Sequence, residues 1–308
     1  MSKLPEYADI ASKQRTFKED FYERIDNPDS IRNVLKRLEN SEEKFFFRGM
    51  KEARYKLYTS GQRAYIQNEY EKIGIEYNDF FLQIIDNLRK DKNLCRYNKA
   101  ACIKSNDAWA FSYLQHYGAP TPYLDFTKSP DIALYFANEG SCFFPSDNEI
   151  DNYFSLYYIK KKDDLELSAK YRKVDDIEKK FHGDSNRERI VMLRELMSIN
   201  KLNNFALFYI SGANKYVKIG KYKILCNIAN RNMIAQQGIL LYNASKDQPI
   251  ENLKDMKNNI HCIDIHKSLL PMINNEFVIG NKITHDVLFP DEYKIARKAY
   301  SDFQRTIR

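Results

Sequence analysis

One stretch of the chain gathers several side chains that could act on a substrate: LQHYGAPTPYLDFTKSPDIALYFAN, residues 114–138. Gln115, His116 and Tyr117 stand directly before a loop rich in glycine and proline. Histidine can act as a general acid or base or can orient a ligand, and tyrosine can stack on a base. His116 could also be a capping or core residue at a helix C-terminus. Because loops placed by rigid elements often carry function, we favour the functional interpretation.

Two polar residues follow the loop. Asp125 and Thr127 are two positions apart, so in a strand their side chains share one face. Asp125 is a candidate catalytic acid and Thr127 a candidate ligand contact. Capping of the helix that starts at Pro130 would by itself explain Thr127 or Ser129. We expect the polar residues of this stretch to form one wall of a pocket and its ALYFA portion to pack in the core.

Arg48 is a further candidate, near the end of the apolar run FFFRGM. An unpaired buried guanidinium is costly, so Arg48 must have a partner. One interpretation is a structural salt bridge, with Asp125 as a possible partner. The other is a clamp that holds phosphate bidentately, with Gly49 allowing a ligand to approach the backbone.

The elements that position these residues are mainly helical in the first half of the chain. Apolar spacing predicts two helices over 17–38, broken at Asn27-Pro28, with Ser30 as the N-cap of the second. The run 45–50 predicts a strand. The remaining predictions are a short strand and a helix start over 55–63 with Thr59 or Ser60 as cap, a long helix over 65–88, and a helix over 109–117 that stops at Gly118.

The second half is richer in strands. Short β-branched or aromatic runs predict strands at 153–159, 204–210, 221–228, 238–242 and 260–265. A charged insertion near 160–200 has a helical core at 190–199, and a last helix is predicted at 291–304. The sequence therefore predicts an α+β fold with a central mixed or antiparallel sheet of short strands flanked by helices. We divide it into an N-terminal helical segment, 1–40, and an α+β domain, 41–308.

Composition restricts the class of protein. The 49 Lys and Arg against 42 Asp and Glu give a formal net charge of +7, which favours acidic partners such as nucleic acid or phosphorylated ligands. The five cysteines form no C-x-x-C pair, so neither a disulfide framework nor a metal site is expected. No apolar run approaches the ~20 residues that cross a bilayer, and a signal peptide is not evident. We therefore expect a cytoplasmic protein without a membrane partner.

Several segments resemble one known family. Phe47-Arg48-Gly49, followed by Tyr55-Lys56-Leu57 and Ser60-x-x-Arg63, resembles the motif that names the FRG domain. The stretch 114–137 resembles its central signature, RNMIAQQG at 231–238 a later segment, and LFPD at 288–291 its closing motif. The chain departs at Tyr123-Leu124-Asp125-Phe126, where the family usually has Leu-Leu-Asp-Trp, and at Leu240, where an aromatic is common. The family occurs in bacterial and phage-associated proteins whose biochemistry is mostly unassigned.

A second, more distant resemblance is to ADP-ribosyltransferases of the Arg-Ser-Glu type. There an arginine on a strand orients NAD, and a polar strand precedes a helix of alternating Ala and Phe, as in 124–137 here. The third motif of those enzymes is a glutamate on a late strand, where this chain has Gln236 and Gln237. The resemblance implies NAD as a cofactor, held by the residues Arg48, Gly49, Gln115, Tyr117, Thr127 and Gln236. The candidate catalytic residues are His116, Asp125 and Gln237.

These observations predict a nucleotide-acting effector, an ADP-ribosyltransferase-like enzyme that uses NAD in bacterial toxicity or anti-phage defence. Its acceptor would be a nucleic acid or a protein. The basic charge and the missing glutamate equally suit a nucleotide- or nucleic-acid-binding module without chemistry. A metal-dependent nuclease is the weakest hypothesis, because no carboxylate or histidine cluster is apparent.

Overall fold

The fold was analysed in a computed structural model of the chain. It describes residues 3–101, 107–160, 205–208, 216–219, 222–225, 231–243, 245–253, 256–257, 259–291 and 297. The predicted helical core at 190–199 lies outside these residues, as does nearly all of the predicted last helix.

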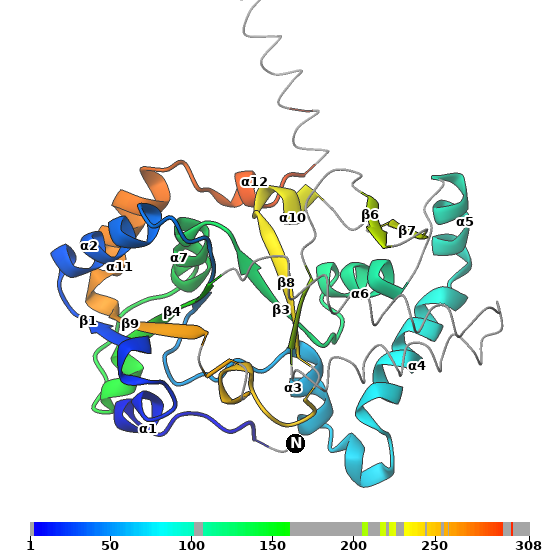
Figure 1. Cartoon of the computed structure of the whole chain (residues 1–308), viewed down its shortest axis with the longest axis horizontal. Coiled ribbons are helices and arrows are strands. Elements are labelled where there is room, and N and C mark those ends of the chain that lie inside the picture. The colour runs from blue at the N-terminus through cyan, green and yellow to red at the C-terminus, as the bar shows by residue number, and fades with distance from the viewer. Residues whose placement is uncertain are drawn as a thin grey trace, which may run out of the picture.

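A mixed sheet of seven strands forms the centre of the protein (Figure 1). Its strands in spatial order are β1 (Tyr22–Ile25), β9 (Ile260–His266), β4 (Tyr153–Lys160), β2 (Phe45–Met50), β3 (Tyr123–Thr127), β8 (Gly238–Asn243) and β5 (Phe205–Phe208). The β1–β9 pair is parallel and all other pairs are antiparallel. A separate hairpin joins β6 (Tyr216–Ile219) to β7 (Tyr222–Leu225). The predicted α+β fold with a mixed sheet is thus confirmed.

The sheet is weakly joined at its middle. Strands β2 and β4 pair over six residues and β3 and β8 over five, but β2 and β3 share only the pair Phe47 and Thr127. Beyond this pair the two central strands separate. In Figure 1, β9 lies across the view while β8 runs up and down, so the strand direction turns strongly between the two halves.

Helices cover the sheet in two groups. The longer α-helices of the described chain are α2 (Pro28–Glu39), α3 (Ser60–Gln67), α4 (Tyr77–Lys90), α5 (Lys92–Ala100), α6 (Asp107–His116) and α7 (Pro130–Asn138). Shorter ones are α1 (Ile10–Gln14), α10 (Arg231–Ala235), α11 (Leu270–Ile273) and α12 (His285–Leu288). Single turns of other helix types lie at Glu19–Phe21, Tyr70–Ile73, Glu149–Asn152, Ile250–Asn252 and Lys267–Leu269, with a π-helical turn at Asn274–Ile279.

Three apolar clusters separate the faces of the sheet. On one face, α2, α7 and α11 pack over Phe47, Phe154 and neighbouring strand residues. On the same face of the other half, α4 and α6 pack over Tyr123 and Leu240. The opposite face carries a third cluster around Phe46, Phe126 and Tyr157.

The N-terminal helical segment is the main error in the predicted fold. Residues 22–25 are strand β1, because they pair in parallel with β9 and bury Ile25. The helix after it is capped by Asn27, whose side chain accepts a hydrogen bond from the Ser30 amide, so Ser30 is not the N-cap. Residues 22–25 show that tertiary pairing overrides a helical apolar spacing.

The long helix predicted over 65–88 is also wrong. It is interrupted by a 3₁₀ turn flanked by left-handed residues, Glu69 (φ 54°) and Gly74 (φ 79°). The short strand predicted near residue 55 does not form, whereas the helix start is confirmed with Thr59 as its N-cap. No helix in the described ranges is long and apolar enough to cross a membrane.

Candidate functional site

A cavity of about 480 Å³ opens where the two central strands part. It lies between the end of α6 and the middle of α7, and residues of β2 and β3 also line it. This volume falls in the ~300–1,000 Å³ range of small-ligand sites. Its lining comprises Phe47, Arg48, Gly49, Met50, Lys51, Tyr55, Gln115, His116, Asp125, Phe126, Thr127, Ala133, Phe136, Asn232, Met233, Gln236, Gly238 and Phe289.

Arg48 is held on the cavity floor by a single hydrogen bond. Its Nη1 donates to the backbone carbonyl of Asp125 at 2.6 Å, across the gap between β2 and β3. Its Nε is buried and has no hydrogen-bond partner. Burial lowers the pKa of Arg48, while the negative charge of Asp125 opposes this effect. The Arg48 and Asp125 side chains form no ion pair within 4 Å, so a salt bridge to Asp125, which was one of the two interpretations of Arg48, does not form.

Asp125 meets Gln115 instead. The Gln115 Nε2 donates to Asp125 Oδ2 at 2.6 Å, and the Gln115 Oε1 accepts a hydrogen bond from the Thr121 hydroxyl. The Asp125 side chain is open to the cavity, but protein surrounds it on all other sides. Burial raises the pKa of Asp125, and the positive charge of Arg48 and the Gln115 hydrogen bond partly counter that rise. The orientation of the Gln115 amide is thus fixed, because its nitrogen needs the Asp125 acceptor and its oxygen needs the Thr121 donor.

His116 lines the cavity, but Tyr117 does not. Burial lowers the pKa of His116, with Asp125 acting in the opposite direction. A neutral imidazole at pH 7 can accept a proton. The Tyr117 ring is 68% exposed and packs on Tyr113 and His116, with ring centroids 4.6 and 4.7 Å away. The predicted stacking role of Tyr117 therefore has no support from its position outside the cavity.

Thr127 and Gln236 are largely engaged within the protein. The Thr127 hydroxyl donates to the Gln236 carbonyl at 2.7 Å and accepts from the Ser129 amide at 3.2 Å. The Gln236 side-chain amide donates to the Leu288 carbonyl at 3.1 Å. Ser129 is the N-cap of α7, accepting from Ile132 N. Thr127 and Gln236 thus join β3 to the turn before β8 and to the closing motif, although both line the cavity.

Gln237 is directed away from the cavity. It is exposed, has a left-handed backbone (φ 49°), and does not line the cavity. Its carbonyl accepts from the Lys128 amide at 3.2 Å. The turn into β8 thus separates the side chains of Gln236 and Gln237. A catalytic role for Gln237 has no geometric support.

Gly49 allows helix α7 to approach β2 closely. A Cβ atom built on Gly49 would lie 1.9 Å from the Ala133 carbonyl oxygen and 2.9 Å from the Ala137 Cβ. Helix packing therefore explains this glycine without a ligand, although its backbone also borders the cavity.

Several lining residues have little or no signal in the sequence. Lys51 follows β2 directly and belongs to no motif, whereas Tyr55 begins the FRG-like spacing Tyr55-Lys56-Leu57. Phe136 was expected to be core, yet it borders the cavity and meets Phe289 edge to face, with ring centroids 6.2 Å apart. Asn232, Met233 and Phe289 come from late segments that only the fold brings here.

Comparison with protein-family models identifies the domain that contains the centre of this cavity. The model of the FRG domain matches residues 43–142, from the start of β2 to beyond the end of α7. The chain contains an FRG domain. The matched region includes the Arg48, Gln115, His116 and Asp125 side chains that line the cavity. Comparisons with curated proteins and with solved structures give no match.

The FRG domain therefore contributes the centre of the cavity, and later segments complete it. Gln236 and Phe289 lie outside the matched residues. A second positive charge, Arg63, also lowers the pKa of Asp125 and so opposes the effect of burial. The Arg63 Nη1 donates a hydrogen bond to the Tyr58 carbonyl at 2.9 Å. In the described ranges, no group of three or more His, Cys, Asp or Glu residues could hold a metal ion.

Proposed function

We propose that the cavity of the FRG domain binds NAD and cleaves the bond between nicotinamide and ribose. The observation that carries the proposal is the pairing of opposite charges on the cavity floor without a direct ion pair. Arg48 keeps a buried N–H without a protein acceptor, and the Asp125 carboxylate faces the same space. An anionic group of a ligand in the cavity would give the Arg48 guanidinium a charged hydrogen-bond partner.

The reaction needs little covalent help from the protein. The C1′–N bond breaks heterolytically, and its electron pair neutralises the pyridinium nitrogen of the leaving nicotinamide. The ribose is left as an oxocarbenium ion, which a carboxylate can stabilise electrostatically. Water or an acceptor nucleophile then adds at C1′ and loses its proton to a base.

Asp125 and His116 suit these two tasks. The ionised Asp125, held by Gln115, supplies the negative charge near the developing cation. His116, with its lowered pKa, is neutral and can take the proton of the attacking group. The aromatic lining from Phe136 and Phe289 suits a planar ring of the ligand.

A second candidate function is binding of a nucleotide without cleavage. It is favoured by the position of the late glutamines, since Gln236 is bonded to the Leu288 carbonyl and Gln237 faces away from the cavity. The strand that bears a glutamate in the enzymes of similar motif order thus offers no acid here. For cleavage, the negative charge that stabilises the oxocarbenium ion would have to come from Asp125.

The test measures release of nicotinamide from NAD and binding of NAD by the purified protein. Asp125→Asn should lower the release rate by about 100-fold or more while NAD still binds, because it removes charge that acts mainly in the transition state. Arg48→Ala should weaken binding itself, by about 10- to 100-fold. Arg24→Ala, an exposed arginine paired with Glu149, is the matched control and should change neither.

The outcomes separate the two functions. Binding of NAD with no release under any acceptor condition would leave only the binding module. Unchanged binding and release in Arg48→Ala would overturn the proposed site.

A further inference from the structure

Residues 51–58 follow β2 directly and border the cavity, and we name them the wall segment. Two of its residues, Lys51 and Tyr55, line the cavity. Lys51 is exposed, and Tyr55 is 43% exposed. In the part of the chain that the structure describes, neither side chain makes a hydrogen bond or an ion pair. Both side chains are therefore available to a ligand.

The backbone of the wall segment, by contrast, is anchored by residues from the N-terminus. The Ala53 carbonyl accepts from Lys13 Nζ at 2.9 Å, and its amide donates to the Tyr153 carbonyl at 3.0 Å. The Arg54 carbonyl accepts from the Tyr7 amide at 2.9 Å. These contacts fix the backbone of Ala53 and Arg54, which lie between Lys51 and Tyr55 in the chain.

Tyr7 anchors the far end of the wall segment as well. Its hydroxyl donates to Glu251 Oε1 at 2.9 Å, and the same carboxylate accepts from the Leu57 amide at 3.1 and 3.2 Å. The Leu57 carbonyl accepts from the Ile250 amide at 3.2 Å. The Lys56 ammonium lies 4.9 Å from the centroid of the Tyr7 ring.

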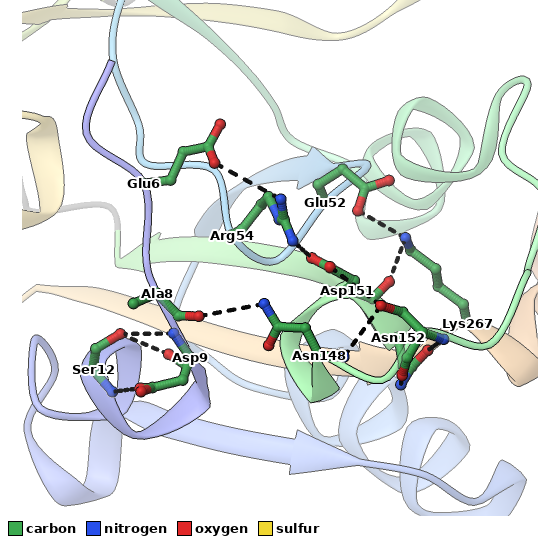
Figure 2. A network of polar contacts seen from close by, with 11 residues as sticks. Glu6, Ala8, Asp9, Ser12, Glu52, Arg54, Asn148, Asp151, Asn152 and Lys267 are labelled. Atoms are coloured by element: carbon green, nitrogen blue, oxygen red, sulfur yellow. Dashed lines mark hydrogen bonds and ion pairs between the residues drawn. The ribbon is translucent and has the colours of Figure 1, made fainter. Parts of the chain in front are cut away.

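Ion pairs complete the anchoring on the outer side. Figure 2 shows Arg54 between Glu6 and Asp151, and Lys267 reaching both Glu52 and the Asp151 carbonyl. The Lys267 Nζ lies 2.8 Å from Glu52 Oε2 and 2.7 Å from that carbonyl. Charged side chains of the wall segment that do not face the cavity thus have partners.

Lys13 is itself fixed by the sheet. Its ammonium is fully buried and bonds to Ser155 Oγ of β4 and Asp264 Oδ1 of β9, each at 2.6 Å. Ser155 and Asp264 are fully buried too. Since a buried ammonium needs all its partners, its position is determined by two neighbouring strands. Because Lys13 Nζ also bonds to the Ala53 carbonyl, the backbone of the wall segment is held in a defined place relative to these two strands.

We propose that the wall segment is a ligand-binding element in which Lys51 binds the diphosphate of a nucleotide, Tyr55 packs on its sugar or base, and Lys13 is the positioning residue. The proposal rests on the proposed function only for the ligand class. Arg48 and Lys51 both line the cavity, and two cations match a diphosphate. The anchored backbone reduces the ordering cost of presenting the two side chains.

The first experiment measures binding of ADP and of adenosine by titration calorimetry. Lys51→Met should weaken ADP binding about 10- to 100-fold, because a charged hydrogen bond is lost, and should leave adenosine binding unchanged. Tyr55→Ala should weaken both ligands. Lys72→Met, an exposed lysine paired with Glu69 and not in the cavity lining, should weaken neither.

The second experiment tests whether Lys13 acts through the wall segment. Lys13→Met combined with Asp264→Asn removes both buried charges and leaves Ser155 and Tyr22 a polar partner. The pair should weaken ADP binding in the natural background and weaken it less in the Lys51→Met background, where only the contact of Tyr55 remains to be lost, because coupled residues are non-additive. Amide hydrogen exchange at 53–57 should rise in the paired variant. If that variant does not fold, Tyr7→Phe, which frees Glu251, replaces it in the same cycle.

Additive losses, or ADP affinity unchanged by Lys51→Met, would overturn the inference. Absence of ADP binding to the natural protein would overturn it too. Loss of nicotinamide release with ADP binding and its Lys51 dependence intact would count against the proposed reaction alone.

Discussion

At the scale of single residues, the site contains two opposite charges, Arg48 and Asp125, whose side chains do not form a direct ion pair. Arg48 bonds to the carbonyl of Asp125, whereas the carboxylate of Asp125 bonds to Gln115. The Nε of Arg48 is buried without a hydrogen-bond partner, which burial of a charged group makes costly. Perturbed, incompletely paired groups in a cavity are typical of functional sites.

The pH dependence of nicotinamide release is the prediction that belongs to this scale. Because burial raises the pKa of Asp125, its charge forms only above the ordinary carboxyl value of about 3.9. The rate should therefore rise with pH through that raised pKa. It should reach a plateau once Asp125 is ionised and His116 is neutral. A pH series of initial rates measures this.

Asp125→Asn is the control for the pH series, and its residual rate should lose the part of the acidic limb that ionisation of Asp125 contributes. A natural enzyme whose rate is flat between pH 4 and 7 would contradict the role given to Asp125. The same raised pKa means that ionising Asp125 lowers the free energy of unfolding as the pH rises through it.

Sequence reasoning located most of these residues by type and spacing, but not all. Arg48, Gln115, His116 and Asp125 do line one cavity. Gln237 was misplaced because a left-handed turn redirects its side chain, which a strand pattern does not reveal. Phe289 was missed because only folding brings a residue so distant in sequence beside Phe136.

At the scale of elements, strands with strong local signals were predictable and those defined by distant partners were not. The run 45–50 and the Ser129-capped helix α7 have bulky apolar or capping signals in a few residues. The apolar spacing of strand β1 also fits a helix. This segment forms a strand only because it pairs with β9, which lies far along the chain. The gap between β2 and β3 likewise has no signal in either strand alone.

The packing of α7 on β2 gives a prediction at this scale. Gly49→Ala would place a Cβ 1.9 Å from the Ala133 carbonyl oxygen, so the helix must move. Overpacking of this kind costs about 1–3 kcal/mol and sometimes more, and we expect about 3 kcal/mol because the clash is with backbone. Urea denaturation measures the loss.

Gly238→Ala is the matched control on another strand. Its Cβ would lie 3.4 Å from the Met233 carbonyl oxygen, so the loss of stability should be much smaller. Equal losses in the two variants would show that close approach of α7 is not the reason for glycine at position 49.

At the scale of the whole molecule, residues near the N-terminus join strands from the middle and end of the chain. Lys13 bonds to Ser155 of β4 and Asp264 of β9, and Tyr22 OH donates to Asp264 Oδ2 at 2.8 Å. This cluster has no signal in the sequence, because lysine is rarely buried without a partner and the partners of Lys13 are more than a hundred residues away.

The buried ion pair of Lys13 and Asp264 leads to a prediction about the stability of the whole chain. Lys13→Met leaves Asp264 buried without its cation, which costs about 3–5 kcal/mol. That is a large share of the ~5–15 kcal/mol by which domains are stable. Combining it with Asp264→Asn should recover most of the loss, because no buried charge then remains unpaired. Urea denaturation of both variants measures this, and a loss below about 1 kcal/mol in the single variant would mean that the N-terminal residues do not hold the sheet together.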